Sequence, residues 1–139
     1  MNSIELIEKA KEARRKAFAP ISNYLVGAAL LTSEGRVYLG SNIEDASGIG
    51  VTNCCAERCA FIKAISEGER EFSAIAVVGG FKNSLEECTP CGVCRQYMMN
   101  WNPNLKVITE DDNEIKEFIL KDLLPNAWYE IVGGENEKV

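Results

Sequence analysis

The sequence predicts an α/β fold, a three-layer α/β/α sandwich with a mixed, mostly five-stranded sheet. Helical stretches and short apolar runs alternate along the chain in the order α, ββ, α, β, α, β, β. Helices between successive strands require crossover connections, and these produce a mixed sheet that is covered on both faces. The 139 residues contain no repeat, linker or low-complexity tract, so we expect one domain over residues 1–139.

The first part of the chain is predicted to form a helix followed by a hairpin. Apolar residues recur at helical spacing among Lys, Glu and Arg, at Leu6, Ala10, Ala13 and Ala17. Asn2 or Ser3 has a side chain that can cap this helix. The apolar runs at 24–32 and 37–44 favour two strands, and Gly35 between them favours the turn of a hairpin.

Helices and strands alternate in the rest of the chain. Helical spacing extends from Cys55 to about Glu67, and a second helix is expected from about Cys91 to Asn100. The segment between the hairpin and the first of these helices is a Gly-containing loop. Strands are predicted over 72–80, 104–111 and 114–120, and a short helix or turn over 121–128.

Charge and hydropathy argue against several classes of protein. The net charge is −6, and an acidic surface repels the phosphate backbone of nucleic acids. The clearest cationic cluster, "KEARRK" at 11–16, is interpreted as the wet face of the first helix. No apolar stretch approaches the roughly 20 residues that span a bilayer, and the N-terminus is charged where a signal peptide is apolar. We therefore expect a cytoplasmic protein with no nucleic-acid or membrane partner.

The cysteines are the candidate metal-binding residues. The chain has six of them and no histidine, and in the cytoplasm such thiols point to metal or catalysis before disulfides. They form two clusters, "TNCCAERCAF" at 52–61 and "TPCGVCRQ" at 89–96, each where a loop becomes a helix. Helix starts stabilise thiolates, so Cys55, Cys91 and Cys94 can direct three sulfurs at one cation. Three sulfur ligands leave a fourth position open, which is typical of a catalytic zinc site.

Glu57 and Arg58 follow the first of these ligands. A carboxylate beside a zinc-bound water can accept its proton and deliver it elsewhere, so Glu57 is the candidate catalytic residue. Cys-x-Glu followed by Pro-Cys-x-x-Cys also matches the signature of the zinc nucleobase deaminases. Three thiolates reduce the electrophilicity of zinc, and Arg58 can restore it by hydrogen bonds to sulfur. The alternative for Arg58 is a salt bridge on the helix surface.

The other three cysteines have simpler interpretations. Cys54 directly precedes Cys55 and cannot share its direction, whereas Cys59 lies one helical turn further on. Cys88 lies three residues before Cys91. We expect Cys54, Cys59 and Cys88 to be small, buried or half-buried apolar side chains without a role in metal binding.

At these residues the sequence resembles the cytidine deaminase family, the small homotetrameric enzymes of pyrimidine nucleoside salvage. The resemblance covers nearly the whole chain, through "VGAALLTSEG" (26–35), "SNIEDAS" (41–47), "CAERCAFIKAISEG" (55–68), "TPCGVCRQ" (89–96) and "LLPNAW" (123–128). It implies a cytidine deaminase-like fold, a homotetramer, and one zinc ion per chain held by Cys55, Cys91 and Cys94. Glu57 would then move protons between water and the base.

The resemblance also implies residues that bind the substrate. Asn42 and Glu44 would hydrogen-bond the ribose, with Glu44 at the 3′-hydroxyl; the alternative is a strand end with a solvated Glu. Tyr24 stands where the family usually has Phe, and it would lie against the pyrimidine face. Ala56 would be a further substrate-binding residue.

Several positions depart from the family pattern. The stretch between Asn42 and Cys55 is two residues longer than usual, and its loop from Asp45 to Asn53 lacks the usual Tyr. In the family this loop helps to complete the site, partly across a subunit boundary. Leu25 replaces a Pro, and Trp128 replaces a terminal Phe that borders a neighbouring subunit's site. The nucleoside preference therefore stays open.

The predicted reaction is the zinc-dependent hydrolytic deamination of cytidine and 2′-deoxycytidine to uridine and 2′-deoxyuridine, with release of ammonia. A carboxylate at the 3′-oxygen would repel a 3′-phosphate, so the expected substrate is a free nucleoside and not a strand. One alternative is a deaminase of another aminopyrimidine nucleoside, such as blasticidin S. The other is a structural zinc protein, which needs four ligands and leaves Glu57 without a function.

Overall fold

The computed structural model describes residues 1–132, and its elements follow the predicted order. They are α1 (Ser3–Arg14), β1 (Tyr24–Thr32), β2 (Val37–Ser41), the 3₁₀ turn η1 (Gly50–Thr52), α2 (Ala56–Ser66), β3 (Phe72–Phe81), α3 (Gly92–Met99), β4 (Lys106–Asp111), β5 (Glu114–Ile119) and the 3₁₀ turn η2 (Leu120–Leu123). Within the described residues, no helix has the length and apolar character needed to cross a membrane.

The strands form one mixed five-stranded sheet in the order β2-β1-β3-β4-β5. β1 is antiparallel to both β2 and β3, and β4 is antiparallel to β5. β3 and β4 are parallel, and the chain between them crosses over through α3. The mixed sheet predicted from the alternation of helices and strands is therefore confirmed.

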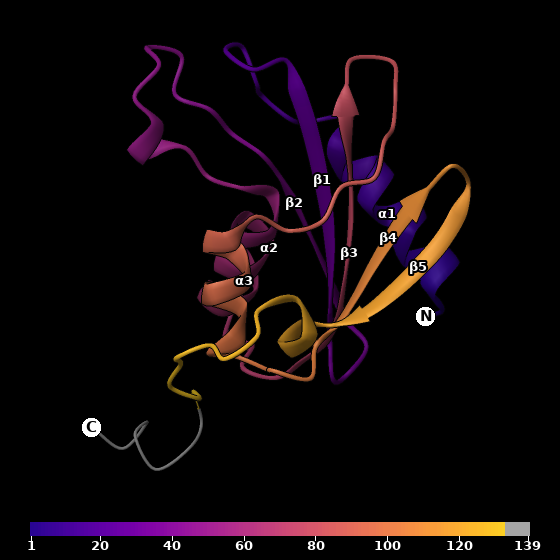
Figure 1. The fold of residues 1–139 in the computed structure, drawn as a ribbon, viewed down its shortest axis with the longest axis vertical. Coiled ribbons are helices and arrows are strands. Elements are labelled where there is room, and N and C mark those ends of the chain that lie inside the picture. Colours follow the sequence, from indigo (N-terminus) through magenta and orange to yellow (C-terminus); the bar gives the residue numbers. More distant parts are fainter. Residues whose placement is uncertain (133–139) are drawn as a thin grey trace.

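Helices cover both faces of this sheet (Figure 1). On one face, Leu6 of α1 belongs to a buried apolar cluster with Ala29 of β1. On the other face, Phe61 of α2 and Met98 of α3 are buried in a cluster with Leu30. Neighbouring residues of β1 thus face opposite layers, as side chains do along a strand. The three-layer architecture is confirmed.

The first helix is shorter than its apolar spacing predicts. Asn2 caps it through a capping box, so the first of the two candidate caps is the one used. The helix ends at Arg14, and the prediction that includes Ala17 is wrong. The N–H of Ala17 bonds to the carbonyl of Arg14 at the spacing of a turn, and the N–H of Phe18 donates to the carbonyl of Asn42.

The second strand also ends early, at Ser41, so the prediction that it reaches Glu44 is wrong. The N–H of Asn42 still donates to the carbonyl of Val26 at 3.1 Å, but its side chain replaces its carbonyl as the acceptor in this pairing. Its Oδ1 accepts from the N–H of Val26 at 2.8 Å, and its Nδ2 donates to the carbonyl of Tyr24 at 2.8 Å. Because the side chain pairs with β1, the backbone carbonyl of Asn42 can turn to the segment that follows α1.

Close backbone approach fixes α2 on the sheet. A Cβ at Gly40 of β2 would lie 2.2 Å from the carbonyl oxygen of Ala56 and 2.5 Å from the nitrogen of Ala60. Only glycine leaves room for this approach. The first turn of α2, where Ala56 and Glu57 lie, therefore has its distance from β2 set by Gly40.

Candidate active site

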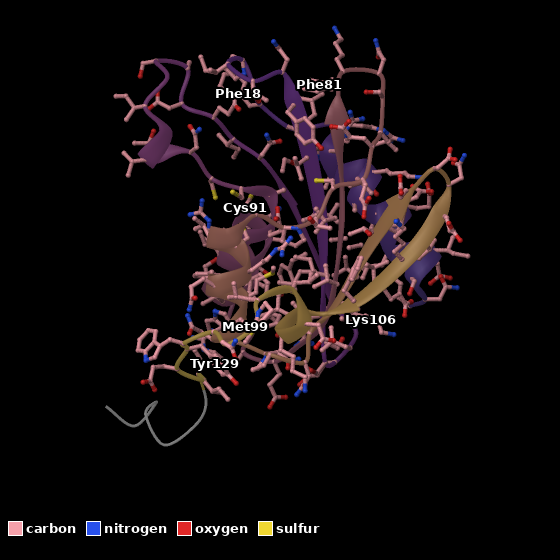
Figure 2. The ribbon with its side chains drawn as sticks, in the orientation of Figure 1. Phe18, Phe81, Cys91, Met99, Lys106 and Tyr129 are labelled. Carbon is pink, nitrogen blue, oxygen red and sulfur yellow. The ribbon has the colours of Figure 1, made fainter. Side chains whose placement is uncertain are left out.

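Three cysteine sulfurs meet where two helices begin. Cys55 is the N-cap of α2 and Cys91 the N-cap of α3, which confirms the predicted loop-to-helix transitions. Cys94 lies in the first turn of α3 and is fully buried. Figure 2 labels Cys91 at the start of α3. The three Sγ atoms all lie within 4.8 Å of one another, and those of Cys55 and Cys91 are 3.6 Å apart.

The geometry of this three-sulfur group fits a zinc ion. Zinc–thiolate bonds of about 2.3 Å in a tetrahedral site place ligand sulfurs roughly 3.8 Å apart, close to the separations found here. Within residues 1–132, no fourth Cys, His, Asp or Glu joins the group. Cys54, Cys59 and Cys88 are half-buried, as expected, and lie outside it. The donor set thus leaves one tetrahedral position for a water or a substrate atom.

Arg58 lies beside the sulfurs and not in a surface salt bridge. Its Nη2 is 3.7 Å from Cys55 Sγ and 3.4 Å from the carbonyl oxygen of Asn53. In the part of the chain that the structure describes, it forms no ion pair with a carboxylate. A hydrogen bond from Cys94 and then one from Arg58 lower the pKa of the Cys55 thiol, whereas the same bond to Cys55 raises the pKa of Cys94. Arg58 thus favours the thiolate at Cys55, the form that binds metal.

A small cavity opens beside the sulfur group. Its volume is about 210 Å³, and its lining consists of Tyr24, Val26, Asn42, Cys55, Ala56, Glu57, Cys88, Thr89 and Cys91. Four residues predicted to act on or bind substrate therefore line the same cavity as two of the predicted ligands. Val26, Cys88 and Thr89 were not predicted to belong to the site.

Glu57 is the buried acid of this cavity. Only 4% of its surface is exposed, although it lies in the first turn of α2. Burial raises the pKa of the Glu57 carboxyl to about 7. A carboxyl that titrates near neutral pH can both accept and donate a proton, as a general acid–base must.

Tyr24 and Asn42 form the side of the cavity that β1 and the end of β2 provide. The amide of Asn42 is oriented by its two hydrogen bonds to β1. The ring of Tyr24 meets Phe81 edge-on, with 5.1 Å between the ring centroids. Burial and hydrogen bonds from its hydroxyl to Cys88 and Glu86 raise the pKa of Tyr24. The phenol therefore stays neutral, and contacts with Phe81, Cys88 and Glu86 fix its position.

Glu44 is the one predicted substrate residue outside the cavity lining. Its Oε1 accepts hydrogen bonds from the N–H groups of Ile21 at 2.9 Å and Ser22 at 3.1 Å. Hydrogen bonds from the Ser22 hydroxyl and backbone lower the pKa of Glu44. The carboxylate thus closes the turn after α1 and is ionised at neutral pH.

Cys88 illustrates why some residues of the cavity lining were not predicted from the sequence. A Cβ at Gly79 would lie 2.7 Å from Cys88 Sγ and 3.1 Å from the ring of Tyr24, so both side chains occupy the space above a glycine. Burial and then the nearby Glu57 raise the pKa of the Cys88 thiol to about 11, so it stays neutral. Its position three residues before Cys91 was the available signal, but this contact depends on Gly79 in a distant strand.

Comparison with known proteins identifies a family that matches most of the chain. The sequence profile described as "Cytidine and deoxycytidylate deaminase zinc-binding region" matches residues 1–109, which include all three sulfur ligands. A cytidine deaminase from Sporosarcina psychrophila is 42% identical over 130 residues, 92% of this chain and 92% of that protein. One from Halalkalibacterium halodurans is 46% identical over 125 residues, 88% of this chain and 91% of that protein.

Solved structures agree with the sequence comparison. The crystal structure of a cytidine deaminase from Burkholderia pseudomallei matches with a TM-score of 0.82 and 44% identity, over 92% of this chain and 100% of that chain. A blasticidin-S deaminase from Bacillus cereus is a more distant relative, 28% identical over 127 residues, 88% of this chain and 89% of that protein. The fold and the three-cysteine group are thus those of a zinc-binding deaminase family.

Proposed function

The chain belongs to the cytidine and deoxycytidylate deaminase family, and from this premise we propose that it hydrolyses cytidine and 2′-deoxycytidine to uridine and 2′-deoxyuridine. The observation that carries the proposal is the buried Glu57 in the same cavity as the sulfurs of Cys55 and Cys91. An acid–base residue beside an open metal position suits hydrolysis and not a structural site.

Glu57 moves the protons of this reaction. When bound, zinc supplies the Lewis acid that activates the attacking water. Glu57 accepts a proton from that water as the C4–O bond forms, and donates it to ring nitrogen N3. It then carries the second proton of the water to the 4-amino group, the C4–N bond breaks, and ammonia leaves. Glu57 ends in its starting state, as a catalyst must.

Arg58 and the three sulfurs together would set the Lewis acidity of the zinc ion. Cys55, Cys91 and Cys94 would hold one zinc ion per chain, and three thiolates make zinc a weaker Lewis acid than neutral ligands do. The Nη2 of Arg58, 3.7 Å from Cys55 Sγ, withdraws electron density from that sulfur. Its role in the proposal is therefore to restore the electrophilicity that the third thiolate removes.

Four residues would bind the nucleoside. Tyr24 and Ala56 line the cavity where the base would lie, and Asn42 presents its oriented amide to the ribose. The Oε1 of Glu44 is held by two backbone N–H groups, and its Oε2 would accept the 3′-hydroxyl. A 3′-phosphate would meet this ionised carboxylate, so the substrate is a free nucleoside and not a nucleic-acid strand.

Blasticidin S is the second candidate substrate. The loop from Asp45 to Asn53 differs from the family pattern, and a blasticidin-S deaminase is among the relatives, at 28% identity. The cytidine deaminases above are 42% and 46% identical, which favours cytidine. A structural zinc protein is disfavoured because no fourth ligand joins the sulfur group within the described residues.

We also propose that the whole chain, residues 1–139, forms one zinc domain and that it assembles as a homotetramer in the cytoplasm. In a reducing compartment such as the cytoplasm the thiol ligands stay unoxidised, which suits this location. Apolar side chains on the loop before α2 are exposed, with Val51 at 91% and Ile49 at 53%, and Trp128 is 75% exposed. Exposed groups of this kind suit burial by neighbouring subunits. A monomer with full activity in sedimentation at micromolar concentration would contradict the tetramer.

Glu57→Gln tests the proposed function. The amide keeps the shape of the side chain and removes the base, so the variant should fold and retain one zinc per chain. Its kcat for cytidine should fall by at least about 10²- to 10⁴-fold, the range for a lost general acid–base. Metal content and ammonia release are measured on the same preparation. Loss of zinc would make Glu57 a ligand, and near-parent turnover would place the proton transfer elsewhere.

A further inference from the structure

Arg14 makes an unusual set of contacts at the end of α1. Its Nε donates to the carbonyl of Leu25 at 3.0 Å. Its Nη2 donates to the carbonyls of Gly80 at 3.0 Å, Phe81 at 2.9 Å and Ser84 at 2.7 Å. Four carbonyls from two distant segments thus converge on one guanidinium. Its interpretation as part of the wet face of "KEARRK" is wrong, because the side chain is half-buried.

The two segments held by Arg14 are those that carry one wall of the cavity. Leu25 lies between Tyr24 and Val26 in β1, and both of these line the cavity. Gly80 and Phe81 end β3, and the chain then turns back so that the N–H of Glu86 bonds to the carbonyl of Gly79 at 2.9 Å. This return leads directly to Cys88 and Thr89 in the cavity lining.

The backbone is closely packed at both ends of the Arg14 side chain. A Cβ at Gly27 would lie 2.1 Å from the carbonyl oxygen of Ala10 and 2.4 Å from the nitrogen of Arg14, so α1 rests directly on β1. A Cβ at Gly80 would lie 2.5 Å from the carbonyl oxygen of Ser84, so the return after β3 is equally tight. The sheet already pairs Leu25 with Gly80 and Tyr24 with Phe81, so what Arg14 adds to this pairing is its bond to Ser84 in the return after β3.

Arg14 forms no ion pair within residues 1–132. Its positive charge therefore strengthens the hydrogen bonds to the four backbone carbonyls. The planar guanidinium offers five donors in fixed directions, whereas a lysine ammonium is a point charge on a flexible stem. Charge-assisted hydrogen bonds of this kind are about twice as strong as neutral ones. Arginine and lysine should therefore differ at this position although both are cations.

We infer that Arg14 is a positioning residue of the substrate cavity: it ties β1 to the return after β3 and so fixes Tyr24 and Cys88 as one wall. Arg14 itself does not line the cavity, so it acts through these two residues. The inference rests on the proposed function, since the wall is the one against which the base would lie. The plainer alternative is that Arg14 only stabilises the fold.

Kinetics of Arg14→Gln and Arg14→Lys separate the two roles. Arg15→Gln is the matched control, because Arg15 is exposed and makes none of the carbonyl contacts that Arg14 makes. Zinc content, melting temperature, kcat and KM for cytidine are measured on each variant. A misplaced wall should raise KM by about tenfold or more in Arg14→Gln, with zinc retained and with a smaller rise in Arg14→Lys.

Alkylation of Cys88 supplies a readout that does not depend on turnover. Iodoacetamide labelling of the zinc-loaded protein, mapped by mass spectrometry, should be several-fold faster at Cys88 in Arg14→Gln than in the parent or Arg15→Gln. A lower melting temperature with unchanged KM and unchanged Cys88 labelling would reduce Arg14 to a stabilising residue and overturn the inference. Loss of zinc in proportion to activity would also overturn it, by moving the effect to the metal.

The same experiment distinguishes failure of the inference from failure of the proposed function. If the parent releases no ammonia from cytidine, the proposed function fails, and the labelling of Cys88 still shows whether Arg14 holds the wall. If the parent is active and both Arg14 variants match it in KM and labelling, only the inference fails.

Discussion

Gly40→Ala tests whether the approach of α2 to β2 positions the active site. The added Cβ would lie 2.2 Å from the carbonyl oxygen of Ala56 and 2.5 Å from the nitrogen of Ala60. Both are backbone atoms of α2, so a side chain cannot rotate away to relieve the contact. Ordinary contact distances of about 3.5 Å require the helix to move by roughly 1 Å or more.

The structure sets the expected size of both effects. Overpacking of this kind costs about 1–3 kcal/mol, which at this chain length lowers the melting temperature by roughly 4–12 °C. The same displacement shifts Cys55 and Glu57 relative to Cys91 and Cys94, and a misplacement of about 1 Å can reduce catalysis by about 10²-fold. We therefore expect weaker zinc retention and a fall in kcat/KM of about 10- to 100-fold.

The assay compares Gly40→Ala with Gly50→Ala. A Cβ at Gly50 meets no atom within 4 Å, so the control adds the same methyl group without a clash. Thermal unfolding, zinc content and cytidine turnover are measured for both variants. A Gly40→Ala protein with the parent's melting temperature and kcat/KM would show that the contact between α2 and β2 does not set the site.

Three further predictions concern the ligands, the ribose contact and the pH dependence of stability. Cys55→Ala should lose zinc and activity, whereas Cys54→Ala and Cys59→Ser should keep the metal. If Cys54→Ala loses zinc and Cys55→Ala retains it, the assignment of Cys55 as the ligand is wrong. Glu44→Ala should raise KM for cytidine by about 10- to 100-fold with zinc unchanged, and brisk turnover of single-stranded DNA by the parent would contradict the role of Glu44. Two hydrogen bonds of 2.7 Å from Arg36 lower the pKa of Glu69, so this pair stabilises the fold above the usual Glu pKa of about 4.3 and the contribution is lost as the pH falls through the lower folded value. Arg36→Gln should therefore lower the melting temperature at pH 7 and have little effect near pH 3, and equal shifts at both pH values would refute the coupling.

Local chemistry in the sequence was enough to place the metal centre. Cysteines at two loop-to-helix transitions define Cys55 and Cys91 as N-caps without knowledge of the sheet. The three-layer fold followed from the alternation of elements, because crossovers place helices on both faces. These predictions depend on spacing within short segments, which is what a single sequence contains.

The rest of the site depends on contacts between distant segments. The end of β2 at Ser41 follows from the side chain of Asn42, which accepts from the N–H of Val26 in place of its backbone carbonyl. Cys88 reaches the cavity because Gly79 leaves space for its sulfur. Arg14 belongs to a charged run, and only the carbonyls gathered around it distinguish it from Arg15. No local pattern contains these relations.

Cytidine turnover by the zinc-loaded chain is the most direct test of the central claim, that a three-thiolate zinc centre and Glu57 deaminate a free nucleoside. Uridine and ammonia are measured in the same reaction, before zinc is removed with a chelator, after its removal, and after it is restored. The account predicts equal amounts of the two products, their loss with the metal and their return when zinc is added back. Absence of ammonia from cytidine, or turnover that persists after the zinc is gone, would contradict it.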